Sequence, residues 1–375
     1  MLIWVFWGSL FLTLYTYLIY PVILAVLVKI RRIRHTDERD SHAETLSVAV
    51  LCAMYNEEKV VREKIDNFLQ LKYKRIRLYI GSDGSSDATN LILREFKDND
   101  KITFYEFPRR GKVHVINDLM AKATEEIVVF TDANSMFESN AVSNLVKYFQ
   151  NLKVGAVCGR LILLSSGCTT GEGLYWRYET AIKKLENAMD CVIGANGAIY
   201  AVRRNLLKPL PINTINDDFI NSMRVVEQGY GIRYAEDAVA YEEAKQNDEI
   251  EFRRHIRDGA GHYSAIVTLY KLLNPIKFKP FFLYVSHRVI RWLVPFFMIF
   301  MVVIPIFIRW DPIVHCIYAM EIIFYFQVIF AWLTKTKIRY LYFPYYFVYI
   351  NVALFVGFLR TVLGLQKVAW DSTER

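Results

Sequence analysis

Long uncharged stretches at both ends of the chain predict membrane spans. Residues 1–28 contain no charged side chain, and this length is enough for one helix across a bilayer. A basic run follows at residues 29–34. Because basic residues stay on the cytosolic side, we expect the N-terminus outside and the next domain inside. A cleaved signal peptide would carry its basic residues before the apolar stretch, so we predict that residues 1–28 remain as a transmembrane helix.

The last third of the chain repeats this pattern. Uncharged stretches cover residues 292–308, 312–333 and 341–359. They predict two to three further membrane helices within residues 292–366, followed by a tail at residues 367–375. The basic loop at residues 335–339 should be cytosolic. Glu321 lies inside one of these spans, where pairing within the helix bundle and a functional role are equally open.

The segment before these spans predicts contact with the membrane surface. Residues 274–291 mix basic and aromatic side chains, a composition typical of a helix that lies in the headgroup layer. A buried amphipathic helix is the alternative. Residues 253–258 are strongly basic, and their guanidinium groups would match either the phosphate oxygens of a ligand or the membrane surface.

Short apolar strands alternate with amphipathic helices in the middle of the chain. Strands are expected at residues 46–51, 76–80, 102–107 and 127–130. Helices are expected at residues 57–71, 87–96 and 111–123. This alternation predicts a cytosolic α/β domain over residues 35–273, with a mostly parallel sheet covered on both faces. Ligands of such sheets bind beyond the carboxyl ends of the strands, which is where the polar motifs of this chain lie.

Composition narrows the class of protein further. The chain has 375 residues, of which 54% are apolar and 22% charged, which excludes both a disordered chain and a pure membrane bundle. Five cysteines exclude a small disulfide scaffold. The net charge of +8 suits anionic membranes, nucleic acid or phosphate-bearing substrates. No glycine-rich fingerprint follows the first strand, and the sequence around Lys112 lacks the P-loop pattern, so the common dinucleotide-binding and P-loop classes are also excluded.

Polar residues at the strand ends supply candidate chemistry. Asp83 follows the second strand and would accept hydrogen bonds from a base or a ribose, although polar cap residues often stand there. Asp132 and Asn134 follow the fourth strand, and in an extended segment a spacing of two puts both side chains on one face. Two hard oxygens there suit Mg²⁺ or Mn²⁺ shared with a diphosphate, whereas a helix N-cap is the alternative.

Two later segments complete the set of candidate residues. The loop from Gly194 to Gly197 consists of small residues that would let a bulky ligand approach, although a tight turn is the simpler explanation. Asp217 and Asp218 are adjacent carboxylates, of which one would face the site and the other support it. A carboxylate beside a metal and a diphosphate can act as general base toward a hydroxyl, whereas a capped helix start is the alternative.

In this order, these residues resemble the family 2 glycosyltransferases in their membrane-embedded form. The resemblance extends over about residues 48–263 and to the flanking membrane segments. Each motif alone is unspecific, but the ordered series between membrane anchors is specific. The resemblance implies an α/β domain of the GT-A type that binds a nucleotide sugar, with a mostly parallel sheet and flanking transmembrane helices.

The resemblance also implies roles for individual positions. It implies nucleotide-sugar binding by Ala53, Tyr55, Glu57, Asp83, Lys112, Asp132 and Arg257. It implies acceptor binding by Asn196, Gly197, Asp217 and Arg254. It further implies a divalent metal, Mg²⁺ or Mn²⁺, on Asp132 and Asn134, and Asp218 as the catalytic base. The chain departs from the family pattern at Asn134, where the motif has a second Asp. It also departs in the basic Gln-x-x-Arg-Trp motif, where Arg254 and Asp258 replace Gln and Trp and only Arg257 agrees.

The implied activity is inverting transfer of a hexosyl or N-acetylhexosaminyl group from a nucleotide-diphosphate sugar, expected to be a UDP-sugar. The acceptor would be a glycan or a polyprenyl-linked molecule at the cytosolic face of a lipid bilayer, expected to be the bacterial inner or plasma membrane. The product would enter a surface or extracellular polysaccharide.

Two alternatives remain beside this activity. One is a processive synthase that also secretes its polymer, and the altered basic motif and the few spans weigh against it. The other is a non-catalytic membrane scaffold, or a transporter with a nucleotide-binding domain. Nucleic acid is not an expected partner, whereas a homo-oligomer or a polysaccharide assembly complex stays open.

Overall fold

The computed structural model describes residues 1–31, 46–164, 170–243, 248–309, 311–334, 336 and 338–366. The tail at residues 367–375 lies outside the described residues, as do parts of the basic runs at residues 29–34 and 335–339. The chain divides into two compact units. Among the described residues, the sheet unit comprises residues 46–164 and 187–243. The helical unit comprises residues 1–31, 170–186 and the described residues between 248 and 366.

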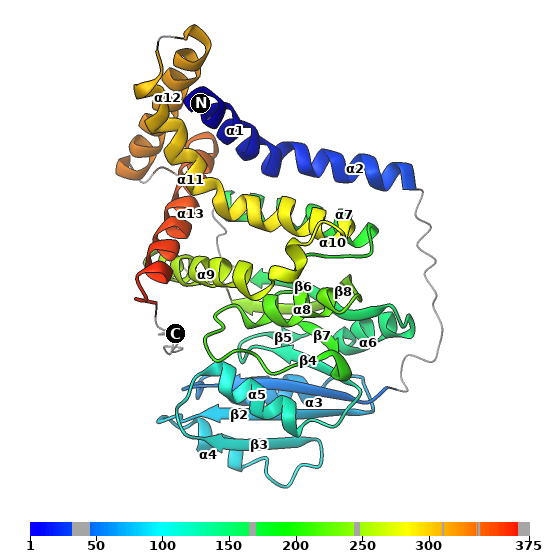
Figure 1. The fold of residues 1–375 in the computed structure, drawn as a ribbon. Helices are drawn as coiled ribbons and strands as arrows, with labels where there is room; N and C mark the ends of the chain where they lie inside the picture. The colour runs from blue at the N-terminus through cyan, green and yellow to red at the C-terminus, as the bar shows by residue number, and fades with distance from the viewer. Residues whose placement is uncertain are drawn as a thin grey trace. The chain divides into compact units, whose positions relative to one another are not determined.

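The sheet unit contains an eight-stranded sheet within the described residues, in the order β3-β2-β1-β4-β7-β6-β8-β5 (Figure 1). Its strands are β1 Val48–Met54, β2 Ile76–Asp83, β3 Ile102–Phe107, β4 Ile127–Thr131, β5 Met136–Phe137, β6 Val154–Leu164, β7 Tyr200–Arg203 and β8 Gly231–Glu243. The neighbours from β3 to β4 pair in parallel, and so do β6 and β8. β7 runs antiparallel to β4 and β6, and β5 runs antiparallel to β8. The predicted α/β class with a mostly parallel sheet is confirmed.

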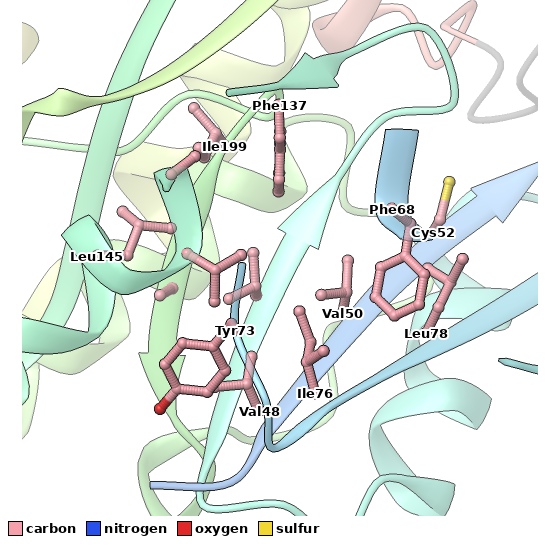
Figure 2. Packing of buried hydrophobic residues seen from close by; sticks show 14 of the residues in the cluster. Val48, Val50, Cys52, Phe68, Tyr73, Ile76, Leu78, Phe137, Leu145 and Ile199 are labelled. Atoms are coloured by element: carbon pink, nitrogen blue, oxygen red, sulfur yellow. The ribbon is translucent and has the colours of Figure 1, made fainter. Parts of the chain in front are cut away.

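β1 and β4 are apolar along their whole length because both of their faces are covered. Every residue of the two strands is buried. Alternate residues of β1, such as Val50 and Cys52, join the core that also contains Phe68 of α3 (Val61–Leu69), as Figure 2 shows. α5 (Lys112–Lys122) also packs against β1 and β2. Because β1, β2 and β4 run in parallel, their carboxyl ends lie together at one end of the sheet.

Most element boundaries lie close to those predicted. β3 covers the predicted residues, and β1 begins two residues later and ends three residues later than expected. α3 begins at Val61 rather than at Glu57, because the residues between them form a turn. The other helices of the sheet unit are α4 Thr89–Arg94, α6 Ala141–Val146 and α8 Asp217–Glu227.

The helical unit contains long apolar helices from both ends of the chain. Its described helices are α1 Leu2–Leu14, α2 Tyr20–Arg31, α9 Asp248–Thr268, α10 Phe278–Tyr284, α11 Ile290–Val303, α12 Pro312–Thr334 and α13 Arg339–Val362, together with most of α7 Thr170–Ala188. Among the described residues, four helical runs are long and apolar enough to cross a membrane. They are Leu2–Ile30, Phe278–Phe307, Pro312–Thr334 and Tyr340–Val362.

One of these runs joins two segments that were predicted as separate helices. The helix continues from Phe278 to Phe307 through a π-helical turn at Val285–Val289, so the predicted interfacial segment 274–291 and the predicted span 292–308 share one helical run. Lys277, just before it, is exposed. How this run lies toward a membrane stays a prediction.

Charged residues of this run are buried inside the helical unit. Arg291 donates to Glu179 of α7, and both side chains are at least nine-tenths buried. His287 Nδ1 lies 2.6 Å from Glu186 Oε1, which also accepts a hydrogen bond of 2.9 Å from the Tyr20 hydroxyl. The cluster therefore links α7 to helices from both ends of the chain. It is a feature expected of a buried amphipathic helix, the alternative considered for this segment.

Candidate active site

A lysine and two carboxylates meet at the carboxyl edge of the central strands. Lys112 is the first residue of α5, Asp132 follows β4 directly, and Asp217 is the first residue of α8. Lys112 Nζ lies 3.0 Å from Asp132 Oδ1 and 3.4 Å from Asp217 Oδ1. Lys112 and Asp217, which are more than a hundred positions apart, thus belong to one charged cluster. It lies at the carboxyl ends of the strands, where ligands of parallel sheets bind.

Asp218 reaches the same place, because Gly197 has no side chain. A Cβ added to Gly197 would lie 3.2 Å from Asp132 Oδ2 and 3.6 Å from Asp218 Oδ2. The other oxygen of Asp218, Oδ1, accepts a hydrogen bond of 2.7 Å from the Phe219 amide. The structure thus brings together five predicted site residues: Lys112, Asp132, Gly197, Asp217 and Asp218.

The surroundings of the cluster raise the pKa values of both Asp218 and Lys112. Burial, and next the charge of Asp217, raise the pKa of Asp218 from 3.8 to about 7. Burial lowers the pKa of Lys112, but the negative charges of Asp132 and Asp217 have the larger effect and raise this pKa above its usual value. At neutral pH the cluster therefore contains a charged lysine and a carboxyl group that readily exchanges a proton, as a general base requires.

Asp83 is fully buried and holds the loop that leads to Lys112. Its carboxylate accepts hydrogen bonds from the backbone amides of Arg110, at 2.7 Å, and Gly111, at 2.9 Å, and it pairs with the Arg109 guanidinium at 2.5 Å. Gly84 follows with φ +66°, and a Cβ there would come within 2.7 Å of the Arg109 amide nitrogen. The described contacts of Asp83 are thus to protein groups, and its role toward a base or a ribose stays a prediction.

Arg109 is a site residue that the sequence analysis missed. Its guanidinium carbon lies 3.4 Å from the centre of the Tyr55 ring while the same group pairs with Asp83. A stacked arginine and tyrosine form a flat, cationic surface of the kind that suits a base or a phosphate. The available signal was the pair of arginines directly before Gly111.

Ala53 and Glu57 lie at the end of β1 and just beyond it, and both are buried. Ala53 pairs in register with Gly81 of β2. The Glu57 amide donates a hydrogen bond of 2.8 Å to the Thr89 hydroxyl. These contacts fix the first loop of the site, and the predicted part of these residues in nucleotide binding remains untested.

The geometric reason given for Asn134 as a metal ligand is wrong. Asp132 to Ser135 form a turn and not an extended segment, and the Ser135 amide donates to the Asp132 carbonyl at 3.3 Å. The chain turns here because β4 ends at Thr131 and the short strand β5 begins at Met136. Asn134 is half-buried in this turn, and its role as a ligand stays a prediction.

A divalent metal fits the donor set only together with a diphosphate. In the described part of the chain, no three His, Cys, Asp or Glu side chains are grouped so that they could hold a metal. Mg²⁺ usually takes one or two protein carboxylates and completes its shell with phosphate oxygens and water. The half-exposed carboxylate of Asp132, with Gly197 leaving space beside it, matches that mode.

Asn196 braces the loop that carries Gly197. Its amide nitrogen donates a hydrogen bond of 3.1 Å to the Gly159 carbonyl, and its amide oxygen accepts one of 3.2 Å from the backbone amide of Ile199. Gly194 has φ +93°, and a Cβ there would lie 2.5 Å from the Phe219 ring. These contacts fix the loop and place Gly197 at the charged cluster, and the approach of a bulky ligand to it stays a prediction.

Arg254 and Arg257 belong to α9 of the helical unit, so the structure does not group them with the cluster of the sheet unit. α9 packs closely on α13, since a Cβ at Gly357 would lie 2.6 Å from the Ile256 carbonyl oxygen. Arg257 Nε is 4.0 Å from Asp258 Oδ1. The predicted contacts of Arg254 and Arg257 with acceptor and donor stay predictions.

Comparison with known sequences finds similarity to one family over part of the chain. The family model of glycosyl transferase family 2 matches residues 49–208. A poly-beta-1,6-N-acetyl-D-glucosamine synthase of Staphylococcus epidermidis is 24% identical over 255 residues, which cover 66% of this chain and 61% of that protein. The synthase of the same name from Staphylococcus aureus (strain COL) is 23% identical over 250 residues, covering 64% of this chain and 60% of that protein. The chain thus spans about three fifths of the length of these curated relatives.

A solved structure shares the fold. The mannosyltransferase PcManGT from Pyrobaculum calidifontis, in complex with GDP-Man and Mn²⁺, superimposes with a TM-score of 0.70 at 19% sequence identity. The superposition covers 96% of this chain and 99% of that one. At this level of identity the similarity establishes a common fold.

Proposed function

Because this chain carries a family 2 glycosyltransferase domain of the GT-A fold, we propose that it moves a sugar from a nucleotide-diphosphate sugar to a hydroxyl of a glycan or lipid-linked acceptor, with inversion. The proposal rests on one observation: Asp132 and Asp218 lie together beside Gly197, and Lys112 is paired with Asp132. A carboxylate that titrates near neutral pH, next to a fixed cation, is what sugar transfer from an anionic leaving group needs.

In this reaction one bond to the anomeric carbon forms as another breaks. The acceptor oxygen bonds to that carbon from the side opposite the diphosphate, and the diphosphate leaves with the bonding electron pair. Asp218 takes the hydroxyl proton, and Lys112 balances negative charge on the departing diphosphate. Because no protein nucleophile takes part, a single displacement inverts the anomeric centre.

Asp132 would hold a divalent metal together with the diphosphate, with Asn134 as a second ligand from the same turn. Mg²⁺ or Mn²⁺ would neutralise diphosphate charge when bound. Asp83, Tyr55 and Arg109 would receive the nucleoside. Arg254 is proposed to contact the acceptor and Arg257 the donor.

We place the reaction at the cytosolic face of a membrane, with the acceptor delivered from the bilayer. The candidate spans that precede and follow the domain in the chain support this location. The names of the sequence relatives favour a second candidate, a synthase that adds N-acetylglucosamine repeatedly to a growing polymer. The two candidates differ in the length of the product and share the chemistry of each transfer.

A donor screen tests the proposal. Membranes containing the full chain would be incubated with UDP-N-acetylglucosamine, UDP-glucose or GDP-mannose and with Mn²⁺ or Mg²⁺, and free nucleoside diphosphate would be measured. We expect release with at least one donor, and the size of the product would separate single transfer from polymerisation. Asp218→Asn should lower the rate by about 1,000-fold, while Asp98→Asn at an exposed position should leave it unchanged. Wild-type activity retained in Asp218→Asn would overturn the assignment of the base.

A further inference from the structure

Lys64 is a buried lysine to which the proposed reaction gives no part. It lies on α3 with 2% of its surface exposed. Its neighbours on the helix, Arg62 and Glu63, are exposed, so the helix turns this one charged side chain into the core. A buried ammonium is unfavourable unless its hydrogen bonds are made, so its partners indicate why it is there.

The partners of Lys64 stand on both sides of the turn that contains Asp132. Its ammonium donates to the Thr131 hydroxyl at 2.8 Å and to the Ser135 carbonyl, and it lies 4.7 Å from the centre of the Phe137 ring. Thr131 immediately precedes Asp132, and Ser135 immediately follows Asn134. One cation therefore bridges the beginning and the end of the turn.

Further hydrogen bonds make the turn a braced structure. The Thr131 hydroxyl, which accepts from Lys64, donates to the Asp132 carbonyl at 3.2 Å. The Ser135 hydroxyl donates to Glu242 of β8. Burial lowers the pKa of Lys64 to about 8, so the ammonium still carries most of its charge at neutral pH. Without this cation the Ser135 carbonyl and the Thr131 hydroxyl would each lose a buried donor.

We propose that Lys64 is a positioning residue that holds the Asp132 turn in the form that binds a divalent metal and a diphosphate. This inference rests on the proposed function, since it takes Asp132 as the metal-binding carboxylate. Lys64 acts on the turn through its hydrogen bonds to Thr131 and Ser135, and it does not contact the substrate. Outer partners that orient ligands in this way typically change metal affinity by about 10- to 100-fold when they are removed.

The test is a titration of the purified full chain with Mn²⁺, with free Mn²⁺ measured by electron paramagnetic resonance, alone and with UDP or GDP present. Lys64→Met should raise the apparent Kd for Mn²⁺ by about tenfold or more in the presence of the nucleotide. Arg62→Met, a matched substitution at an exposed position of the same helix, should leave the Kd unchanged. In activity assays Lys64→Met should need more Mn²⁺ for half-maximal rate, with a smaller loss at saturating Mn²⁺.

A second variant covers the case in which Lys64→Met does not fold. Thr131→Val keeps the shape of the side chain and removes both the bond from the ammonium and the bond to the Asp132 carbonyl, and it should raise the Kd for Mn²⁺ by about threefold. A folded Lys64→Met, or failing that a folded Thr131→Val, with wild-type affinity for Mn²⁺ would overturn the inference. Sugar transfer by the wild type without any divalent metal would also overturn it and leave the proposed function intact. Wild-type binding of Mn²⁺ and nucleotide without transfer to any acceptor would count against the proposed function alone.

Discussion

The ammonium of Lys112 lies 3.0 Å from Asp132 Oδ1, so the cation expected at the leaving diphosphate is paired with the carboxylate expected at the metal. Asp217 Oδ1 lies 3.4 Å from the same ammonium and offers it a second partner. A divalent metal that binds Asp132 would compete with Lys112 for the carboxylate. Lys112 can then remain paired with Asp217 and direct its remaining donors to the diphosphate, so that donor binding rearranges an existing ion pair.

Replacing Lys112 by Met should lower kcat/KM by about 100-fold, because one preorganised positive group at the leaving diphosphate is lost. The measurement is the initial rate of nucleoside diphosphate release at several donor concentrations. Lys122→Met, at an exposed position of the same helix, is the matched control and should behave like the wild type. A change of less than about threefold in Lys112→Met would show that Lys112 is only a structural partner of Asp132.

The rate of transfer should depend on the ionisation of Asp218. Burial and the charge of Asp217 raise the pKa of Asp218 to about 7, and only the ionised form can accept the hydroxyl proton. Therefore kcat/KM should rise with pH up to about 7 and then level off. Profiles of kcat/KM between pH 5 and pH 9, at fixed ionic strength and saturating metal, would check this.

Asp217→Asn tests the electrostatic cause of this profile. Without the neighbouring negative charge the pKa of Asp218 should fall, so the acid limb should move to lower pH. Asp98→Asn, at an exposed position, should not move it. An acid limb that stays in place in Asp217→Asn would mean that a group other than Asp218 limits the rate.

The sequence predicted those parts of the molecule that have local signals. Continuous apolar runs located β1 and β4 because both strands are buried on both faces. Asp132 and Asp218 were predicted as site residues because one directly follows β4 and the other stands at the start of α8. Ligands of such sheets bind beyond the ends of the strands, whatever the rest of the fold. Both carboxylates lie beside Gly197, at 3.2 Å and 3.6 Å from an added Cβ, and their roles in binding and catalysis stay predictions.

The missed features depend on contacts between distant parts of the chain. In sequence Lys64 resembles any charged residue on the polar side of an amphipathic helix, yet its partner Ser135 lies 71 positions away. The turn at Asp132 could not be foreseen either, because it is set by the start of β5. The pairing of Arg291 with Glu179 could not be foreseen for the same reason, because Glu179 lies 112 positions earlier.

Gly197→Ala should reduce activity with little effect on stability. The added Cβ would lie 3.2 Å from Asp132 Oδ2, closer than most Cβ contacts, so the carboxylate must shift or the loop must yield. Because the proposed metal and the acceptor hydroxyl would both need this space, we expect kcat/KM to fall by about tenfold or more. Donor-release kinetics and the melting temperature would be compared with Gly229→Ala, where an added Cβ meets nothing within 4 Å but where the positive φ of +93° adds strain. A Gly197→Ala enzyme that is as active as the wild type would exclude Gly197 from the reacting site.

The buried pair of Arg291 and Glu179 should decide the stability of the helical unit. The guanidinium donates to Glu179, which holds the pKa of that carboxyl well below its usual value of 4.5 despite burial. Glu179→Gln leaves the arginine buried without a counter-charge and should cost about 3 kcal/mol of unfolding free energy. Glu249→Gln removes an exposed ion pair on α9 and should cost less than about 1 kcal/mol.

Thermal unfolding of the detergent-solubilised chain would measure both effects of Glu179. Since the pKa of Glu179 is lower in the folded chain than in the unfolded one, its contribution is present above about pH 4.5 and should be lost as the pH falls through the folded-state value. This acid-induced loss should be smaller in Glu179→Gln than in the wild type or in Glu249→Gln. Equal melting temperatures for the two variants would contradict a stabilising role of the Arg291–Glu179 pair.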